Sequence, residues 1–428
     1  MHFSETMQIL LVEIFFLGVL SLYIHKLFKL RFICASLGFW FAWVFVLTSS
    51  YYGEYRGWMN INPYIFQYVE KMSFGAFIGF FIADLVCFCN PKINVLSFLK
   101  LEKISIFVIN KYASRVVNII FILGMIALVT RIMQVGLSFN YLTEARQNFI
   151  NEQDYSLLVQ ILSHLMSILT VLLILKGVKD SRTYLDIKGI TKILLMVSPL
   201  YISNATRTFL LLIPLPYFLS FIISRSIING KINLGRKNIT ILVFILTFIG
   251  FIFSIIGFFR GGYGEEFDIL YTILMWPSGT IDVMDIWIDQ AINSPPAYGY
   301  YLFNWPFDIV QRLGIINFSA QFKAMADIQN FFLNTNSTAF FIPRSILPDL
   351  ILDFGVDGII PGMILVGFVL QFISFFAGQS IVLQVSAVLS ILGCWESIGS
   401  SSFGASYFVP IFWAFVLTWW LNRKYGCN

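Results

Sequence analysis

The feature of this sequence that most restricts its fold is a series of apolar stretches long enough to cross a lipid bilayer. A transmembrane helix needs about 20 consecutive, mostly apolar residues. Because backbone polar groups in lipid must bond within their own segment, each stretch predicts a helix. The sequence therefore predicts an all-α polytopic membrane protein with about 11 transmembrane helices. These helices are expected near 7–25, 32–50, 72–89, 115–134, 157–176, 189–204, 208–225, 239–259, 358–377, 380–396 and 408–421.

Composition supports lipid as the solvent of this chain. Only 12% of its residues are charged and 58% are hydrophobic, whereas soluble domains carry about 25% charged residues. The first stretch lacks a basic start and contains Glu13, so it is expected to be a retained helix and not a cleaved signal peptide. None of the 5 cysteines falls in a long polar loop, so no disulfide framework is expected.

The positions of the basic residues predict the topology. Cytoplasmic loops of membrane proteins carry an excess of lysine and arginine. Nineteen of the 28 basic residues follow the first, third, fifth, seventh and last stretches. This alternation puts the N-terminus outside and the C-terminus inside. It also assigns the net charge of +5 to topology, so no nucleic-acid partner is expected.

One long segment interrupts the apolar pattern. The expected organisation is an N-terminal transmembrane bundle over residues 1–259, a large external loop over 260–357 and C-terminal transmembrane helices over 358–428. The loop contains aromatic residues and is expected to form short amphipathic helices on the membrane surface. Its segment 280–293 shows the pattern, since Asp282, Asp285 and Asp289 fall on one helical face.

The basic residues left on the outer side are mostly arginines. Arginine is favoured where a planar fork must bind two oxygens of a phosphate or carboxylate at once. The set therefore suggests an outward-facing site for a phosphate or diphosphate, although arginines that snorkel or pair with external acids would give the same pattern. The nine outer residues are Arg56, Lys71, Arg131, Arg146, Arg207, Arg260, Arg312, Lys323 and Arg344.

Two of these arginines have informative surroundings. Arg207 lies in a very short turn between two apolar stretches, where a charge close to hydrocarbon usually has a partner or ligand. Arg260 opens a glycine-rich segment, Arg260–Glu266, which would allow backbone to approach a ligand closely. A simple hinge between helix and loop explains that segment equally well.

The external carboxylates supply candidates for acid–base chemistry. A carboxylate held near a sugar hydroxyl can act as a general base, and Asp268 is the favoured candidate. The group Glu265, Glu266 and Asp268 has the oxygen ligands of a divalent-cation site, but the favoured interpretation includes no metal and no cofactor. Within the membrane, Glu13, Asp84 and His164 are interpreted as packed polar sites, with a proton relay as the alternative.

Two local motifs resemble those of the O-antigen and oligosaccharide repeat-unit polymerases of the Wzy type. The first is the turn Asn204–Thr208, which leads into the apolar residues Phe209–Leu211. The second is the end of the large loop, where Asn334–Phe340 is followed by the aspartate-phenylalanine-glycine step Asp353–Gly358. The plan of the whole chain is similar as well. There is no nucleotide-binding glycine motif, so an external active site needs a substrate that is already activated and delivered in the membrane.

The resemblance implies a GT-C-like glycosyltransferase in the bacterial inner membrane, with its active site facing the periplasm or exterior. Such an enzyme transfers a glycan from undecaprenyl diphosphate onto the next lipid-linked repeat unit, and a chain-length regulator protein is a further conceivable partner. Asp353 and Arg207 take catalytic and diphosphate-binding roles by motif position. Charge placement adds Arg146, Arg260 and Arg344 to the diphosphate site and Asp268 to the catalytic residues.

Two other functions remain open. The related O-antigen ligases resemble one another in an external-loop histidine, and the large loop of this chain has none. A lipid-linked oligosaccharide flippase or other transporter would show repeat symmetry or charged residues along a path through the membrane. Here charged residues within the membrane are few and the polar residues concentrate in one external loop, so the polymerase interpretation is favoured.

Overall fold

A computed structural model describes residues 3–28, 34–58, 61–89, 106–136, 157–203, 213–229, 274, 279–281, 284–303, 310, 345–396 and 405–425. All regular elements among these residues are helical. In chain order they are α1 (Phe3–Leu27), α2 (Ala35–Tyr55), η1 (Pro63–Ile65), α3 (Phe66–Cys89), α4 (Ile106–Val135), α6 (Leu157–Asp180), α7 (Ile187–Ser203), α9 (Pro214–Asn229), α12 (Met284–Ile292), α15 (Ile346–Phe354), η4 (Val356–Gly358), α16 (Ile359–Phe375), α17 (Ile381–Glu396) and α18 (Ala405–Tyr425).

Each predicted apolar stretch coincides with one of these helices, except 239–259, which lies outside the described residues. Five helical segments among the described residues are long and apolar enough to cross a membrane: Glu5–Leu27, Pro63–Cys89, Val108–Gln134, Ile161–Asp180 and Val356–Phe375. Three shorter apolar helices span Pro214–Ile228, Ile381–Cys394 and Tyr407–Leu421. The predicted all-helical fold is confirmed, whereas the number of membrane spans stays a prediction.

The chain forms two compact units whose segments alternate along the sequence. Unit 1 comprises Met1–Leu96, Leu274–Phe376 and Leu389–Phe408, and unit 2 comprises Ser97–Ile273, Ala377–Val388 and Val409–Asn428. Helices distant in sequence share a unit because they pack together, as α16 does against α3. The expected organisation into bundle, loop and C-terminal helices concerns membrane topology and stays a prediction.

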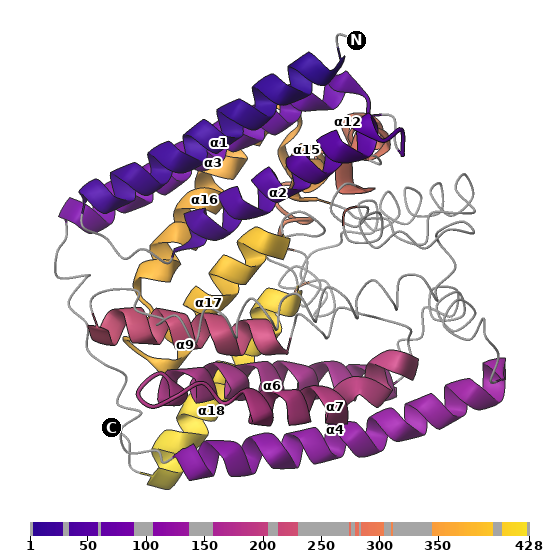
Figure 1. Cartoon of the computed structure of the whole chain (residues 1–428), viewed down its shortest axis with the longest axis vertical. Coiled ribbons are helices and arrows are strands. Elements are labelled where there is room, and N and C mark those ends of the chain that lie inside the picture. Colours follow the sequence, from indigo (N-terminus) through magenta and orange to yellow (C-terminus); the bar gives the residue numbers. More distant parts are fainter. Residues whose placement is uncertain are drawn as a thin grey trace. The chain divides into compact units, whose positions relative to one another are not determined.

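Unit 1 is built around the contact between α3 and α16, and α3 also lies beside α1 (Figure 1). A Cβ atom added at Gly75 would lie 2.8 Å from the backbone oxygen of Ile360, and one at Gly79 would lie 2.9 Å from the backbone nitrogen of Phe368. Small residues four apart allow two membrane helices to approach closely, where lipid gives little hydrophobic drive for association. The Gly75–Gly79 spacing thus explains why α16 packs on this face of α3.

The helices of unit 1 keep a consistent set of directions. Residues that meet between α3 and α16 rise together in number, from Gly75 beside Ile360 to Gly79 beside Phe368, so these helices are parallel. The pairs Gln8 with Tyr51 and Gly18 with Trp40 show that α2 is antiparallel to α1. These relative directions are the ones that the alternation of charged loops predicts for these segments.

Unit 2 contains α4, α6, α7 and α9, and one direction in it differs from expectation. The hydroxyl of Ser220 donates to the backbone oxygen of Ile174, while Tyr217 reaches Asp180, so α6 and α9 are antiparallel. The positive-charge pattern predicts that these two segments run the same way. A rule that counts charges does not register the contacts that fix α9 against α6, such as the close approach of Gly177 to Phe221.

The predicted amphipathic helices of the long loop are present, but they pack against protein. In α12, Met284, Trp287 and Ile288 are buried while Asp289 is exposed, as the pattern predicts. The apolar face of α12 contacts α15 and η1 within unit 1. The described part of the loop is therefore a folded cap on unit 1, because its apolar face finds protein partners there.

Candidate functional site

Asp353, the one predicted site residue that the structure describes, lies at a tightly bonded corner. Its Oδ1 accepts a hydrogen bond from the backbone N–H of Tyr301 at 2.9 Å, and its Oδ2 accepts one from that of Leu302 at 2.8 Å. The side chain is fully buried. A buried carboxylate is costly unless hydrogen bonds replace water, and two amide donors do so here.

Backbone contacts extend this corner, called below the Asp353 corner and comprising residues 297–303 and 352–358. The N–H groups of Ala297 and Tyr298 donate to the carbonyl oxygens of Leu352 and Asp353 at 2.9 and 3.0 Å. Gly355 has a φ of 73°, a value that favours glycine, and it ends α15 just before η4 and α16. Asp353 thus fixes the turn against the start of α16, and its catalytic role stays a prediction.

A second buried acid lies one helical turn earlier on α15. Asp349 is fully buried, like Asp353, and the two are four residues apart on the same helix. Asp289 on α12 is exposed, so burial distinguishes Asp349 from that acid. The four-residue spacing between Asp349 and Asp353 is the sequence feature that could have drawn attention to Asp349.

The remaining predicted site residues lie outside the described residues. They are Asp268 for the catalytic role and Arg146, Arg207, Arg260 and Arg344 for the diphosphate site. The acidic group Glu265 and Glu266 lies outside them as well. Among the residues that the structure does describe, no group of three or more histidines, cysteines and acids is placed to hold a metal ion.

A second candidate site is a chain of buried polar groups that joins four helices of unit 1. Nδ1 of His25 on α1 donates to Oδ2 of Asp84 on α3 at 3.2 Å. Oδ1 of Asp84 accepts from Nε2 of Gln371 on α16 at 2.7 Å, and Oε1 of Gln371 accepts from the backbone N–H of Ser36 on α2 at 3.0 Å. Cys34, at the N-cap of α2, lies beside the same imidazole. These five residues are called the His25 cluster.

The His25 cluster has one open position. The five side chains are at most 2% exposed, and the imidazole stacks on Phe375 with ring centroids 5.8 Å apart. Nε2 of His25 is buried and makes no hydrogen bond to the described part of the chain. An imidazole that is oriented by a carboxylate and free at its other nitrogen is suited to accept or pass on a proton. The cluster can therefore serve as a clamp between helices or as a relay.

Sequence reasoning identified only part of this cluster. Asp84 stood out as an acid within an apolar stretch, a position that usually marks function. His25 was assigned to the end of the first stretch, and Gln371 carries no charge that would draw attention. The pairs are separated by 59 and 287 positions, so no local pattern could have joined them.

Unit 2 contains a different buried network at the end of α6. Nζ of Lys176 lies 3.0 Å from Oδ2 of Asp180 and 2.8 Å from Oδ2 of Asp186. The hydroxyl of Tyr217 donates to Asp180 at 2.8 Å and accepts from the backbone N–H of Asp186 at 2.8 Å. The N–H of Gly189 completes the set by donating to Asp186 at 2.9 Å. These residues are called the Lys176 network.

Asp186 lies in the turn between α6 and α7, and its environment shifts its pKa. Burial raises the pKa of this carboxyl, but the hydrogen bonds from Lys176 and from the N–H of Gly189 lower it by more. The pKa of Asp186 consequently lies below its ordinary value. The network therefore holds a charged carboxylate at the end of α6.

Comparison with known proteins adds no relative to these observations. No protein-family model matches the chain, and no curated protein or solved structure does so either.

Proposed function

We propose that this protein is a membrane glycosyltransferase that polymerises oligosaccharide repeat units carried on undecaprenyl diphosphate. The product would be a surface polysaccharide, either O-antigen or capsule, made on the outer face of a bacterial inner membrane. The proposal includes a GT-C-like arrangement of about 11 transmembrane helices. It rests on the apolar helices, the outer arginine set and the resemblance of Asn204–Thr208 and Asp353–Gly358 to motifs of repeat-unit polymerases.

The observation that best supports the proposal is the Asp353 corner. The segment Asp353–Gly358, on which the resemblance rests, forms a buried and hydrogen-bonded junction between α15 and α16. A flexible loop would position reacting groups poorly, whereas a cap packed on a helical bundle can keep them in one geometry. This rigidity is what a site that aligns two lipid-linked glycans requires.

In the proposed reaction the arginines act on the donor. Arg207, with Arg146, Arg260 and Arg344, would bind the diphosphate and stabilise the negative charge that develops on it as the glycosyl bond breaks. Asp268 would accept the proton from the attacking hydroxyl of the acceptor sugar. Asp353 would act beside Asp268 or keep the loop in place. The Asp353→Asn variant tests Asp353 separately from Arg207.

A second candidate is a transporter of lipid-linked oligosaccharides, and the His25 cluster is the observation that favours it. Buried ionisable groups within membrane helices are rare and often mark proton relays in transporters. If the cluster serves a polymerase only as a clamp, His25→Gln leaves polymer length unchanged, because glutamine keeps a donor toward Asp84. If it drives transport, the same variant reduces the amount of exported glycan.

The deciding experiment is a surface-glycan ladder from the source bacterium with this gene deleted. We expect the ladder to collapse to a single repeat unit on its acceptor, because export and ligation survive without polymerisation. Complete loss of surface glycan would replace the polymerase with the transporter. Long polymer retained on its lipid carrier would indicate a ligase.

Complementation of the deletion tests the diphosphate site. Arg207→Ala is expected to abolish the ladder at normal expression, and Arg207→Lys to restore only part of it because lysine lacks the bidentate fork. Arg56→Ala is the matched control. Arg56 belongs to the same outer set, is exposed, and lies over the rings of Tyr52 and Trp58 at 5.9 and 5.6 Å. Full polymer yield from Arg207→Ala would remove that residue from the mechanism.

A further inference from the structure

Two exposed arginines of unit 2 lie where α4 meets α18. The rings of Tyr112 on α4 and Trp420 on α18 meet edge to face, with centroids 5.0 Å apart. Three residues after each ring comes an exposed arginine, Arg115 on α4 and Arg423 on α18. The first turns of α4 thus lie beside the last turns of α18, as Figure 1 shows, and this place is called the α4–α18 contact.

Both guanidinium groups extend back toward the α4–α18 contact. Side chains on a helix lean toward its N-terminus, and each arginine here follows this rule. Cζ of Arg115 lies 5.8 Å from the centre of the Tyr112 ring. Cζ of Arg423 lies 5.7 Å from the centre of the ring of Trp419, the neighbour of Trp420. The rings therefore hold two cations from different helices at one contact.

No carboxylate neutralises these two cations in the described part of the chain. Neither α4 nor α18 contains an aspartate or a glutamate. Arg115 and Arg423 form no ion pair with the described residues, whereas the buried Lys176 of the same unit pairs with two carboxylates. Topology needs only positive charge, which lysine also supplies, but arginine adds a planar fork that fits phosphate oxygens. The two side chains can therefore donate to an anion from outside the chain.

An exposed apolar face leads away from each arginine. The exposed residues on the Arg115 side of α4 are Ile119, Ile122 and Ile126. Those on the Arg423 side of α18 are Phe412, Phe415 and Trp419. Arg115 lies near the start of the apolar segment Val108–Gln134, and Arg423 lies just past the end of Tyr407–Leu421. A phospholipid has the same order of parts, since its apolar chains end in a charged headgroup at the membrane boundary.

We propose that the α4–α18 contact binds the phosphate headgroup of an anionic phospholipid, whose acyl chains lie along the exposed apolar faces of both helices. Basic sites between membrane helices on the cytoplasmic side recognise such headgroups, and the charge pattern predicts that this end faces the cytoplasm. A zwitterionic headgroup would bring an ammonium beside two guanidinium groups, which opposes its binding. The inference is independent of the enzymatic function and holds for a polymerase or a transporter.

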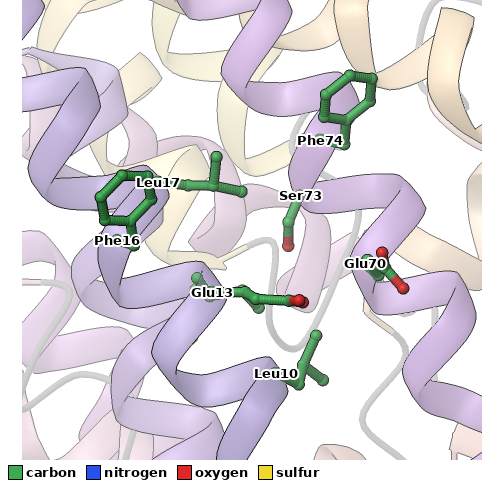
Figure 2. A pocket seen from close by; sticks show the side chains of 8 residues that line it. Leu10, Glu13, Phe16, Leu17, Glu70, Ser73 and Phe74 are labelled. Carbon is green, nitrogen blue, oxygen red and sulfur yellow. The ribbon is translucent and has the colours of Figure 1, made fainter.

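The pocket between α1 and α3 in unit 1 has the opposite charge. Its two charged residues are Glu13 and Glu70, which Figure 2 shows on the facing helices, and apart from Ser73 its other residues are apolar. Carboxylates repel an anionic headgroup, so this pocket is not expected to contribute to a preference for anionic lipids. Glu13→Gln is therefore a control outside unit 2.

The test is lipid competition on the purified full-length protein, read by native mass spectrometry. The protein is titrated with an equimolar mixture of phosphatidylglycerol and phosphatidylcholine that carry the same acyl chains. We expect the first bound lipid to be phosphatidylglycerol with a preference of about 25-fold, because each basic residue near an anionic lipid contributes a factor of about five.

The variants assign the preference to the α4–α18 contact. Arg115→Gln and Arg423→Gln are each expected to lower it about fivefold, and the double variant to bring it close to one. Arg182→Gln is the matched control, since it removes an exposed arginine from the turn between α6 and α7 of the same unit, and it is expected to keep the preference. If the double variant does not insert, Arg115→Lys/Arg423→Lys retains the charge and is expected to lose the preference severalfold, because lysine lacks the fork.

Four results would overturn the proposal. The first two are equal binding of the two lipids to the unmodified protein and an undiminished preference in either double variant. The third is a loss in Arg182→Gln or Glu13→Gln as large as that in the double variant, which would assign the preference to the charge of the whole surface. The fourth is displacement of phosphatidylglycerol by an equal concentration of inorganic phosphate, which would assign the contact to a free anion.

Discussion

The two units each bury a polar network among apolar helices, but only one of the networks is closed. In the Lys176 network the ammonium of Lys176 pairs with the carboxylates of Asp180 and Asp186. The hydroxyl of Tyr217 donates to Asp180, and the backbone N–H of Gly189 donates to Asp186. In the His25 cluster the bonds run in a chain from helix to helix, and Nε2 of His25 stays without a partner in the described residues.

The difference separates a structural network from one that can do chemistry. A buried polar group is retained at low cost only when its hydrogen bonds are satisfied, and the Lys176 network meets this condition. A buried nitrogen without a partner costs stability and is usually explained by a ligand, a proton or a water. We therefore expect mutations in the Lys176 network to cost more stability than mutations in the His25 cluster.

The largest loss of stability is expected from removing the cation of the Lys176 network. Lys176→Met leaves Asp180 and Asp186 without their cation and is expected to destabilise the protein by about 3–5 kcal/mol. The melting temperature of the purified protein in detergent measures this loss. Lys188→Met is the matched control, since Lys188 is an exposed lysine near the start of α7. A melting temperature for Lys176→Met equal to that of the control would show that the network is not what holds α6 and α9 together.

A smaller effect is expected from the open cluster. Asp84→Asn keeps an oxygen that can accept from Gln371 but removes the charge beside His25, and it is expected to cost about 1–3 kcal/mol. A double-mutant cycle with His25→Gln checks that the pair interacts directly, with an expected coupling of about 0.5–3 kcal/mol. Additive effects of the two single variants would mean that His25 and Asp84 act separately. The His25 cluster would then not be a network that can be compared with the Lys176 network.

The smallest effect on stability is expected from Asp186, the partly exposed member of the Lys176 network, and it depends on pH. The folded pKa of Asp186 is below its ordinary value, so at low pH the unfolded chain binds more protons at this residue than the folded chain does. Its contribution to stability is complete above pH of about 4 and is lost as the pH falls through the folded pKa. The side chain is partly exposed, so solvent screening keeps this contribution below about 1 kcal/mol.

Melting curves of the unmodified protein and of Asp186→Asn below pH 5 measure this contribution. The two proteins are expected to converge in stability as the pH falls. A difference that grows toward low pH would mean that the folded protein stabilises the protonated form of Asp186, and that its folded pKa is raised instead of lowered.

Much of the fold could be predicted because lipid simplifies the rules. A long apolar stretch in lipid must be helical, and the elements α1, α3, α6 and α16 lie where their apolar residues place them. Element ends were less predictable. α4 begins at Ile106 instead of near 115, so Lys111 and Arg115 lie on the helix itself and not in a loop. The reason is that basic side chains do not end a helix and can extend from its first turns into the polar region.

The sequence by itself determined that the chain is helical, where its apolar helices lie and that the segment 280–293 contains an amphipathic helix. Only the tertiary structure decided which polar residues meet. His25, Asp84 and Gln371 come together because glycines bring α3 and α16 into close contact and the apolar interior gives polar side chains no other partners. The direction of α9 and the pinning of Asp353 by the amides of Tyr301 and Leu302 were decided the same way, since contacts between distant segments leave no local pattern.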